Sequence, residues 1–313
     1  MDIQTFSDEL ICFGREKRMQ DLAIHPWGEE VRIVFRKNNQ LLSYQETTYE
    51  IAQQLISRFK YLGAMDVGEK RKVQLGAITY PLQETFQRLR LSTVGDYRQR
   101  ESLVIRFLYP LKESQHFFLP QQLTMVEEQT TRNGLYLFSG PTGSGKTTLM
   151  YHLAKRERGQ VITIEDPVEI EEPQFLQLQT NEKILQTYDR LIQLSLRHRP
   201  DVLIIGEIRD KQTAQAAIRA ALTGHKVFAT VHARGVAETM DRMQDFIGKN
   251  QELNHCLTGI IYQRLLPDQK GQTAGLLAYD FKKSPEIKTD WQETLTKIYQ
   301  EGLIDEAIFQ KEG

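Results

Sequence analysis

A glycine-rich loop that ends in a lysine and a threonine is the segment of this sequence best suited to chemistry. Its members in chain order are Gly140, Pro141, Thr142, Gly143, Ser144, Gly145, Lys146 and Thr147. Glycines let consecutive backbone N–H groups turn inward around a polyphosphate, an approach that a Cβ would obstruct. In such loops the lysine reaches the β- and γ-phosphates, and the threonine hydroxyl binds Mg²⁺. The spacing therefore predicts a site for ATP with Mg²⁺, to which Thr148 also contributes.

The residues on either side of this loop supply the context that such a site needs. Residues 135–138 form an apolar run typical of a short buried strand, and residues 148–155 have the pattern of a helix. The phosphates would then lie at a helix N-terminus, where unpaired N–H groups and the helix dipole favour anions. The alternative is a glycine-rich turn that matches the pattern by accident.

An acidic residue follows a second apolar run, at 202–205. Gly206 and Glu207 come directly after that run, which is the form of a Walker B element. The Glu207 carboxylate could organise Mg²⁺ through water, or orient the water that attacks the γ-phosphate. We therefore predict a catalytic and metal-organising role for Glu207.

An acidic cluster follows the apolar run at 161–164. It contains Glu165, Asp166 and Glu169. Phosphoryl transfer depends on positioning and charge neutralisation, so carboxylates opposite the metal are useful. We expect Glu165 and Glu169 to act in catalysis and Asp166 to help hold Mg²⁺. The alternative is a solvated acidic loop, because two further glutamates follow immediately.

Two histidines flank the apolar run at 227–231. His225 precedes the run and His232 follows it. A histidine at a strand end beside a phosphate site can donate a hydrogen bond that senses the γ-phosphate. We expect both histidines to take part in catalysis, against the alternative of ordinary surface or core residues.

The order of these patterns predicts an α/β fold. The four apolar runs alternate with helical patterns, which favours a parallel sheet covered on both faces. Ligands in open α/β sheets bind beyond the carboxyl ends of the strands, so the groups that follow the runs are expected at one sheet edge. Upstream of residue 110, short strand and helix patterns indicate a smaller α+β module. We expect an N-terminal domain over 1–110, a linker over 111–120, and a nucleotide-binding domain over 121–313 with a C-terminal helical segment.

Composition argues against several classes of protein. The 313 residues suggest about two domains, and a net charge of −1 gives no global basic footprint for nucleic acid. No run approaches the roughly 18 consecutive apolar residues of a membrane span, and the N-terminus lacks the pattern of a secretory signal. The only cysteines, Cys12 and Cys256, argue against structural zinc and fit a reducing cytosol.

Four segments together resemble the secretion ATPases, the family that drives type II secretion, type IV pili and competence pseudopili. The segments 140–147, 162–169, 199–210 and 223–232 are similar in order and spacing to its Walker A, aspartate box, Walker B and histidine box. The resemblance implies a RecA-like domain and ATP hydrolysis by a homo-hexamer. It also implies a position at the cytoplasmic face of the cell membrane, where such proteins work a polytopic platform protein.

The resemblance extends upstream into the N-terminal part. Residues 65–74 and the segment that begins at Arg90 are similar to motifs of the family's N-terminal domain. In such proteins that domain is PAS-like, and its arginines reach the nucleotide of a neighbouring subunit. Arg90 and Arg106 best match those arginines, with Arg98 and Arg100 as alternatives.

Departures from the family pattern indicate which members of the family this chain most resembles. The chain runs directly from Pro267 to Gly271 without the family's tetracysteine loop, so no zinc is expected. Residues 20–23 read Gln-Asp-Leu-Ala where the family has Ser-Asp-Ile-His. The long N-terminal extension of many members and the retraction-type C-terminal motif are not visible. This short form most resembles the assembly ATPase of the Gram-positive competence pseudopilus, which supports DNA uptake, and assembly is favoured over retraction.

Two other functions compete with the pilus ATPase. A nucleic-acid motor on the same RecA-like core is opposed by the near-neutral charge, so no direct nucleic-acid binding is expected. A non-hydrolysing scaffold is opposed by the intact Lys146, Thr147 and Glu207. The sequence leaves open the cargo pilin, the ring symmetry, the contact surface for the platform and the residue that positions the water.

Overall fold

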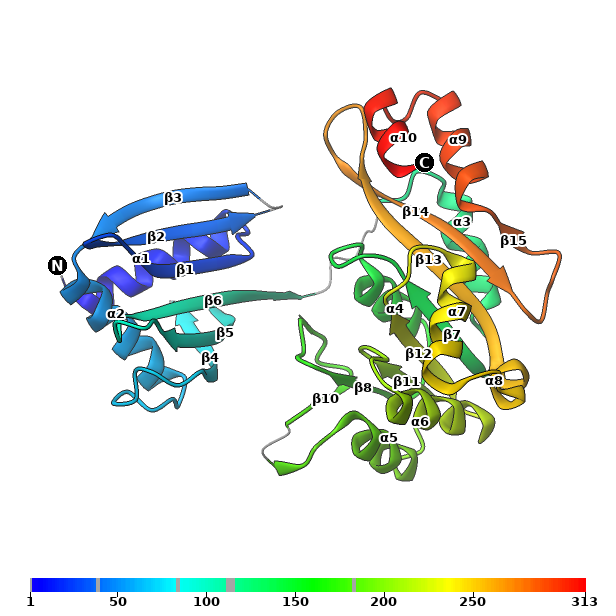
Figure 1. Ribbon diagram of the computed structural model, residues 1–313, viewed down its shortest axis with the longest axis horizontal. Coiled ribbons are helices and arrows are strands. Elements are labelled where there is room, and N and C mark those ends of the chain that lie inside the picture. Colours follow the sequence, from blue (N-terminus) through cyan, green and yellow to red (C-terminus); the bar gives the residue numbers. More distant parts are fainter. Residues whose placement is uncertain (1, 38–39, 83–84, 111–115, 182–183) are drawn as a thin grey trace. The chain divides into compact units, whose positions relative to one another are not determined.

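The structure, a computed structural model, describes residues 2–37, 40–82, 85–110, 116–181 and 184–313. The chain divides after Pro110 into two units, each with its own core (Figure 1). Of the predicted linker, residues 111–115 lie outside the described residues. Among the helices that the structure describes, none has the length and hydropathy needed to cross a membrane.

The first unit is an antiparallel sheet with helices on one face. Its strand order is β3-β2-β1-β6-β5-β4. The strands are β1 (Asp21–Trp27), β2 (Glu30–Lys37), β3 (Gln40–Thr47), β4 (Gln74–Leu82), β5 (Thr85–Gly95) and β6 (Glu101–Pro110). Helices α1 (Ile3–Glu16) and α2 (Tyr49–Leu62) contribute to the same core as the inward-facing strand residues.

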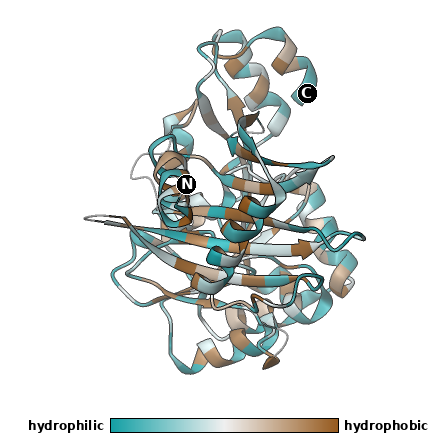
Figure 2. Ribbon diagram, turned by 90° about the vertical axis from the view of Figure 1, so that its left-hand side faces the viewer, coloured by the Kyte–Doolittle hydropathy of each residue, from teal (hydrophilic) through white to brown (hydrophobic). Residues whose placement is uncertain are grey.

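Alternation of apolar and polar residues explains why this sheet has one covered and one open face. In β5, Leu89 and Leu91 are buried, whereas Arg88 and Ser92 are exposed. Successive side chains of a strand point to opposite faces, so this pattern directs one face to the helices and the other to solvent. Figure 2 shows the resulting bands of hydrophobic and hydrophilic residues along the strands.

The second unit contains an eight-stranded sheet of order β10-β8-β11-β12-β7-β13-β14-β15. Neighbours from β10 to β13 are parallel, and β14 and β15 continue the sheet antiparallel. The strands are β7 (Gly134–Ser139), β8 (Val161–Glu165), β10 (Leu176–Gln179), β11 (Val202–Ile205), β12 (Lys226–Val231), β13 (Leu257–Pro267), β14 (Thr273–Phe281) and β15 (Lys288–Thr289). A further short strand, β9, spans Ile170–Glu171.

Helices cover both faces of this sheet. They are α3 (Pro120–Gln129), α4 (Lys146–Lys155), α5 (Tyr188–Arg197), α6 (Lys211–Leu222), α7 (Val236–Ile247), α8 (Gln251–Cys256), α9 (Trp291–Gln300) and α10 (Glu306–Glu312). In β7, Leu135 and Leu137 pack in the core that α5 to α8 share, and Tyr136 and Phe138 pack in the core of α3 and α4. This arrangement confirms the predicted α/β fold with a parallel-rich sheet.

The described part of the predicted linker packs against the second unit. Phe117 bridges Gly275 of β14, and Phe118 N–H donates to the Gly275 carbonyl oxygen at 3.0 Å. Phe118 and Leu119 are buried in the core that holds α9 and α10. Three consecutive large apolar side chains are driven out of water, so residues 117–119 belong to the second unit.

Candidate active site

The phosphate-binding loop connects β7 to α4 at the carboxyl edge of the parallel strands (Figure 1). All three glycines of the loop adopt backbone conformations that other residues rarely take, with φ of 139° at Gly140, 77° at Gly143 and 87° at Gly145. There is also no room for a side chain at Gly140 or Gly145. A Cβ on Gly140 would lie 2.2 Å from the Gln263 carbonyl oxygen, and one on Gly145 would lie 2.8 Å from Gln263 Nε2. Glycine at these two positions therefore lets the loop close against β13.

The Lys146 ammonium lies inside this loop. Its Nζ donates to the carbonyl oxygens of Gly140 at 2.9 Å and Pro141 at 2.8 Å, and the residue is buried. Burial lowers the pKa of Lys146, and the attraction of Glu207 and Glu169 opposes that shift. The loop cation thus lies within electrostatic reach of two of the predicted carboxylates.

Two buried polar atoms lie at the loop without a partner, and one of them, a hydroxyl, fits a phosphate ligand. Within the part of the chain that the structure describes, Ser144 Oγ and Gln263 Oε1 have no hydrogen-bond partner. A buried polar atom without a partner costs free energy, so native proteins seldom leave one unless it has a function. The Ser144 hydroxyl can donate to an anion that enters the loop. The loop residues therefore fit a polyphosphate.

The residues predicted to hold Mg²⁺ also fit that ion. The described ranges contain no cluster of three or more histidine, cysteine or acidic side chains with metal-binding geometry. Mg²⁺ usually keeps waters and binds through one or two protein groups together with substrate phosphates. Thr147, Glu207 and Asp166 are the few protein groups that such a site needs, with waters and phosphate oxygens as the other ligands of Mg²⁺.

Glu207, Asp166 and His232 meet at the carboxyl edge of the sheet. Glu207 Oε2 accepts a hydrogen bond from Arg209 Nε at 2.5 Å, and Glu207 Oε1 lies 3.3 Å from His232 Nε2. Arg209 also contacts Asp166 Oδ2 at 3.4 Å. One guanidinium therefore holds two predicted acidic residues together, a role that the sequence patterns did not indicate for Arg209.

Glu165 lies apart from these acids, in a buried network. Its Oε1 accepts from Tyr151 Oη at 2.5 Å and from Thr163 Oγ1 at 2.6 Å. Burial raises the pKa of Glu165, and those two hydrogen bonds oppose the shift. The structure therefore gives Glu165 a different position from the one expected of a catalytic carboxylate open to the phosphates. Alternation along β8 explains it, because the side chain follows Thr163 onto the face that packs against α4.

Replacing Glu165 with glutamine is expected to stabilise the protein at neutral and alkaline pH. The raised pKa means that ionised Glu165 destabilises the fold above its folded-state pKa, and that the penalty disappears as the pH falls below the unfolded-state pKa. Glu165→Gln removes the charge and keeps an acceptor for both hydroxyls. Thermal unfolding should show a midpoint about 2 °C higher near pH 8 and no gain near pH 4.

The matched control is Glu169→Gln, because Glu169 is an exposed carboxylate on the same segment. It should leave the unfolding midpoint unchanged and should lower ATP turnover more than Glu165→Gln does. A larger gain in acid than in alkali would contradict the placement of Glu165.

His225 lies at the opposite edge of the sheet from the phosphate loop, which corrects the expectation that both histidines serve one site. β12 begins beside Gly134 and ends beside Ser139, which directly precedes the loop. The His225 carbonyl oxygen accepts from Gly134 N–H at 3.2 Å. A six-residue strand spans about 20 Å, so histidines at its two ends cannot share an edge. The His225 ring instead lies 3.2 Å from the Ala220 carbonyl oxygen at the end of α6.

Separate substitutions of the two histidines test this assignment. His232→Ala removes the imidazole beside Glu207 and is expected to lower kcat about tenfold or more. His225→Ala is the matched control and should change kcat less than about twofold, as surface substitutions usually do. Steady-state phosphate release by the assembled protein measures both. An equal fall in kcat in the two variants would contradict the conclusion that only His232 lies at the active edge of the sheet.

Arg90 and Arg106 lie in the first unit, directly opposite each other on β5 and β6. Both follow the alternation that places them on the open face of the sheet. Arg106 Nε forms an ion pair with Asp21 Oδ1 at 2.8 Å, and its side chain is half exposed. Arg100, one of the alternatives, pairs with Asp96 at 2.9 Å.

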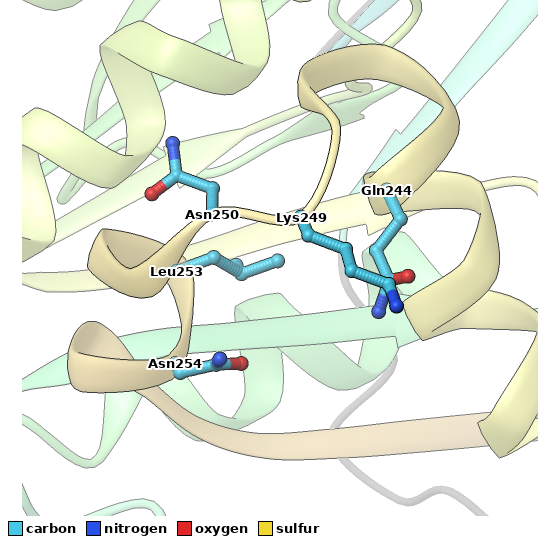
Figure 3. A pocket seen from close by; sticks show the side chains of 5 residues that line it. All are labelled: Gln244, Lys249, Asn250, Leu253 and Asn254. Atoms are coloured by element: carbon cyan, nitrogen blue, oxygen red, sulfur yellow. The ribbon is translucent and has the colours of Figure 1, made fainter.

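A small pocket of about 150 Å³ lies between α7 and α8 (Figure 3). It is lined by Gln244, Lys249, Asn250, Leu253 and Asn254. The helix α8 leads into β13 where that strand pairs with the beginning of β7, at Leu135. The pocket therefore belongs to the amino edge of the sheet and is not part of the phosphate site.

The chain matches a protein-family model described as "Type II/IV secretion system protein" over residues 3–301. The competence protein ComGA of Streptococcus pneumoniae is 42% identical over 304 residues, covering 96% of this chain and 96% of that protein. ComGA of Bacillus subtilis is 38% identical over 272 residues, covering 84% of this chain and 76% of that protein. These matches confirm the resemblance drawn from the four motifs.

Solved structures of two ATPases have the same fold. The Legionella pneumophila ATPase DotB superposes with a TM-score of 0.78 at 21% identity, covering 98% of this chain and 95% of DotB. The pilus retraction motor PilT, solved with bound ADP, gives a TM-score of 0.74 at 25% identity, covering 98% of this chain and 96% of PilT. With its complete phosphate loop, Walker B glutamate and near full-length family match, the chain belongs to the type II/IV secretion system protein family and is an ATPase.

Proposed function

We propose that this chain is a hexameric ATPase that drives assembly of a competence pseudopilus. It works at the cytoplasmic face of the membrane on a polytopic platform protein and thereby supports DNA uptake. The observation that carries the proposal is the similarity to the competence protein ComGA, 42% identity over 96% of both chains, in a chain whose phosphate-binding loop is complete.

The residues at the sheet edge have distinct tasks in ATP hydrolysis. The backbone N–H groups of the loop and Lys146 hold the β- and γ-phosphates. Glu207 orients the attacking water, and His232 keeps the Glu207 carboxylate in place. When bound, Mg²⁺ neutralises negative charge on the phosphate oxygens, and Thr147, Glu207 and Asp166 would hold it. Positioning and charge neutralisation account for most of the catalysis in this type of reaction.

Arginines of a neighbouring subunit complete the site in this proposal. Within the second unit, Lys146 is the cation buried in the loop, and Arg209 is already paired with Glu207. Arg90 and Arg106 form a cross-strand pair on the open face of the first unit. Like charges directly opposite each other in a sheet are unfavourable, and Asp21 already offsets part of this charge through its ion pair with Arg106. A phosphate of the neighbour would take the place of Asp21. We assign Arg90 and Arg106 to the γ-phosphate of the neighbour, so that each nucleotide cycle moves the N-terminal domains that work the platform protein.

The function is tested in the host by comparing a deletion strain with strains that carry the native chain or Lys146→Ala. We expect the tagged native chain to co-purify with a polytopic membrane protein and to restore surface pseudopili and DNA uptake. Lys146→Ala should co-purify with the same protein and restore neither.

Two outcomes would favour the competing functions. A deletion strain that carries more pseudopili than the parent would indicate a retraction motor, the activity named for PilT. ATP turnover that rises strongly with DNA, without a membrane partner, would indicate a nucleic-acid motor. Either result contradicts assembly as the function.

A further inference from the structure

Tyr188 is a residue of the acidic sheet edge that the motifs do not contain. β10 runs parallel to β8, so the segment after β10 leaves the sheet at the edge where Glu165 and Asp166 lie. The helix α5 begins at Tyr188 on that edge, and the Tyr188 ring packs against the core beneath α5 and α6. Topology thus brings the start of α5 next to the carboxyl ends of β8 and β11.

The glycine before the Walker B glutamate leaves room for the Tyr188 hydroxyl. A Cβ on Gly206 would lie 3.1 Å from Tyr188 Oη, 3.1 Å from the Ile164 carbonyl oxygen and 3.2 Å from Glu165 Cα. The hydroxyl therefore lies between the last residues of β8 and the residue that precedes Glu207. A side chain at position 206 would occupy this space.

The charges around the hydroxyl are mainly negative. Burial raises the pKa of Tyr188 most, and Asp166, Glu207 and Glu165 raise it further, whereas Arg209 lowers it. A phenol keeps its proton at neutral pH, so the Tyr188 hydroxyl can donate a hydrogen bond. Carboxylates accept hydrogen bonds and cannot donate them when ionised, so the chemistry of donor and neighbours is complementary.

Two groups at this edge have unused hydrogen-bonding capacity. Within the described ranges the Tyr188 hydroxyl makes no hydrogen bond. The Asp166 side chain is half exposed, and its contact with Arg209 is long at 3.4 Å. A carboxylate held by one long contact can rotate. The Tyr188 phenol, which lies beside the last residues of β8, can hold it in one orientation.

We propose that Tyr188 is a positioning residue of the ATPase site, whose hydroxyl donates a hydrogen bond to Asp166 and orients this carboxylate beside Glu207 for the metal and the attacking water. The inference rests on the ATPase function and adds to it a residue that acts through Asp166. Groups that orient metal-binding carboxylates typically affect metal affinity or activity by about 10- to 100-fold.

The test replaces Tyr188 with phenylalanine, which removes only the hydroxyl. We expect kcat to fall about tenfold while KM for ATP at saturating Mg²⁺ changes less than about twofold. Affinity for Mn²⁺ in the presence of ADP, measured by electron paramagnetic resonance, should weaken about tenfold. Tyr279→Phe is the matched control, because Tyr279 is a buried tyrosine of β14 outside the site, and it should change neither quantity.

A double-mutant cycle decides whether Tyr188 acts through Asp166. In an Asp166→Asn background, Tyr188→Phe should have little further effect on kcat or on Mn²⁺ affinity. Independent effects that simply add would overturn the proposal, as would unchanged kcat and Mn²⁺ affinity in the single variant. 4-Aminophenylalanine at position 188 restores a donor on the ring and should recover most of the loss. If Tyr188→Phe does not fold, the variant with 4-aminophenylalanine at position 188 becomes the test. A rate well below that of the native chain would then overturn the proposal.

The metal measurement separates this inference from the function itself. A native chain without ATP turnover, whose Mn²⁺ affinity still falls on loss of the hydroxyl, would contradict the ATPase and leave the role of Tyr188 intact. If the native chain hydrolyses ATP and loss of the Tyr188 hydroxyl changes neither kcat nor Mn²⁺ affinity, the ATPase function stands and the role of Tyr188 is contradicted.

Discussion

Replacing Lys146 with alanine is expected to abolish ATP turnover while both units stay folded. The Lys146 ammonium is the cation that the loop buries, and it is held by two loop carbonyl oxygens at 2.8–2.9 Å. Its loss removes positive charge where the phosphates carry most negative charge. We expect kcat to fall about 10³-fold or more, because catalysis of phosphoryl transfer is mainly electrostatic. Phosphate release by the assembled protein measures the loss.

Lys155→Ala is the matched control for Lys146→Ala. Lys155 ends the same helix and pairs with Glu172 at 2.8 Å, away from the phosphate loop. A partly exposed pair contributes about 1 kcal/mol or less, so this variant should keep native turnover. Circular dichroism should be unchanged in both variants. Near-native turnover in Lys146→Ala would contradict the assignment of the phosphate site.

The parallel core could be predicted from the sequence because its strands are continuous apolar runs. The runs at 135–138, 161–164, 202–205 and 227–231 all lie within β7, β8, β11 and β12. A strand buried on both faces needs apolar residues at every position, and few other local structures impose that pattern. The phosphate loop was predictable for a related reason, since its glycines and its lysine are close in sequence and their chemistry is local.

Some differences between prediction and structure were within reach of the sequence. His225 and His232 stand before and after one six-residue strand, so strand geometry alone places them at opposite edges. The consecutive apolar residues 117–119 likewise argue against an exposed linker. In both cases the correct position could have been predicted from the order and type of the residues.

Other features depend on contacts between segments far apart in the chain. The buried network of Glu165 needs Tyr151 from α4, and the closed phosphate loop needs Gln263 from β13. Tyr188 reaches the acidic edge only because β10 is parallel to β8. Gln263 did carry one signal, because an amide that follows the apolar residues Ile260, Ile261 and Tyr262 in the middle of β13 is costly to bury without a purpose.

Loss of Arg106 is expected to lower turnover as strongly as loss of Lys146, and the two losses should complement each other. An arginine supplied by a neighbouring subunit raises the rate of phosphoryl transfer by about 10³–10⁵. Arg106 pairs with Asp21 in the first unit, but its guanidinium is half exposed. Such a pair contributes about 1 kcal/mol or less and can be exchanged for a phosphate. We therefore expect Arg106→Ala rings to bind ATP normally and to hydrolyse it at a small fraction of the native rate.

Mixing inactive subunits distinguishes a shared site from a site within one chain. A Lys146→Ala subunit still supplies Arg106, and an Arg106→Ala subunit still supplies Lys146. Random rings from equal amounts should recover about a quarter of native turnover if the sites act independently and each combines two neighbours. Specific activity of the native chain should also rise with concentration as rings form. If mixing restored nothing, and a demonstrably monomeric species were fully active, Arg106 would act within its own chain or only stabilise the first unit through Asp21.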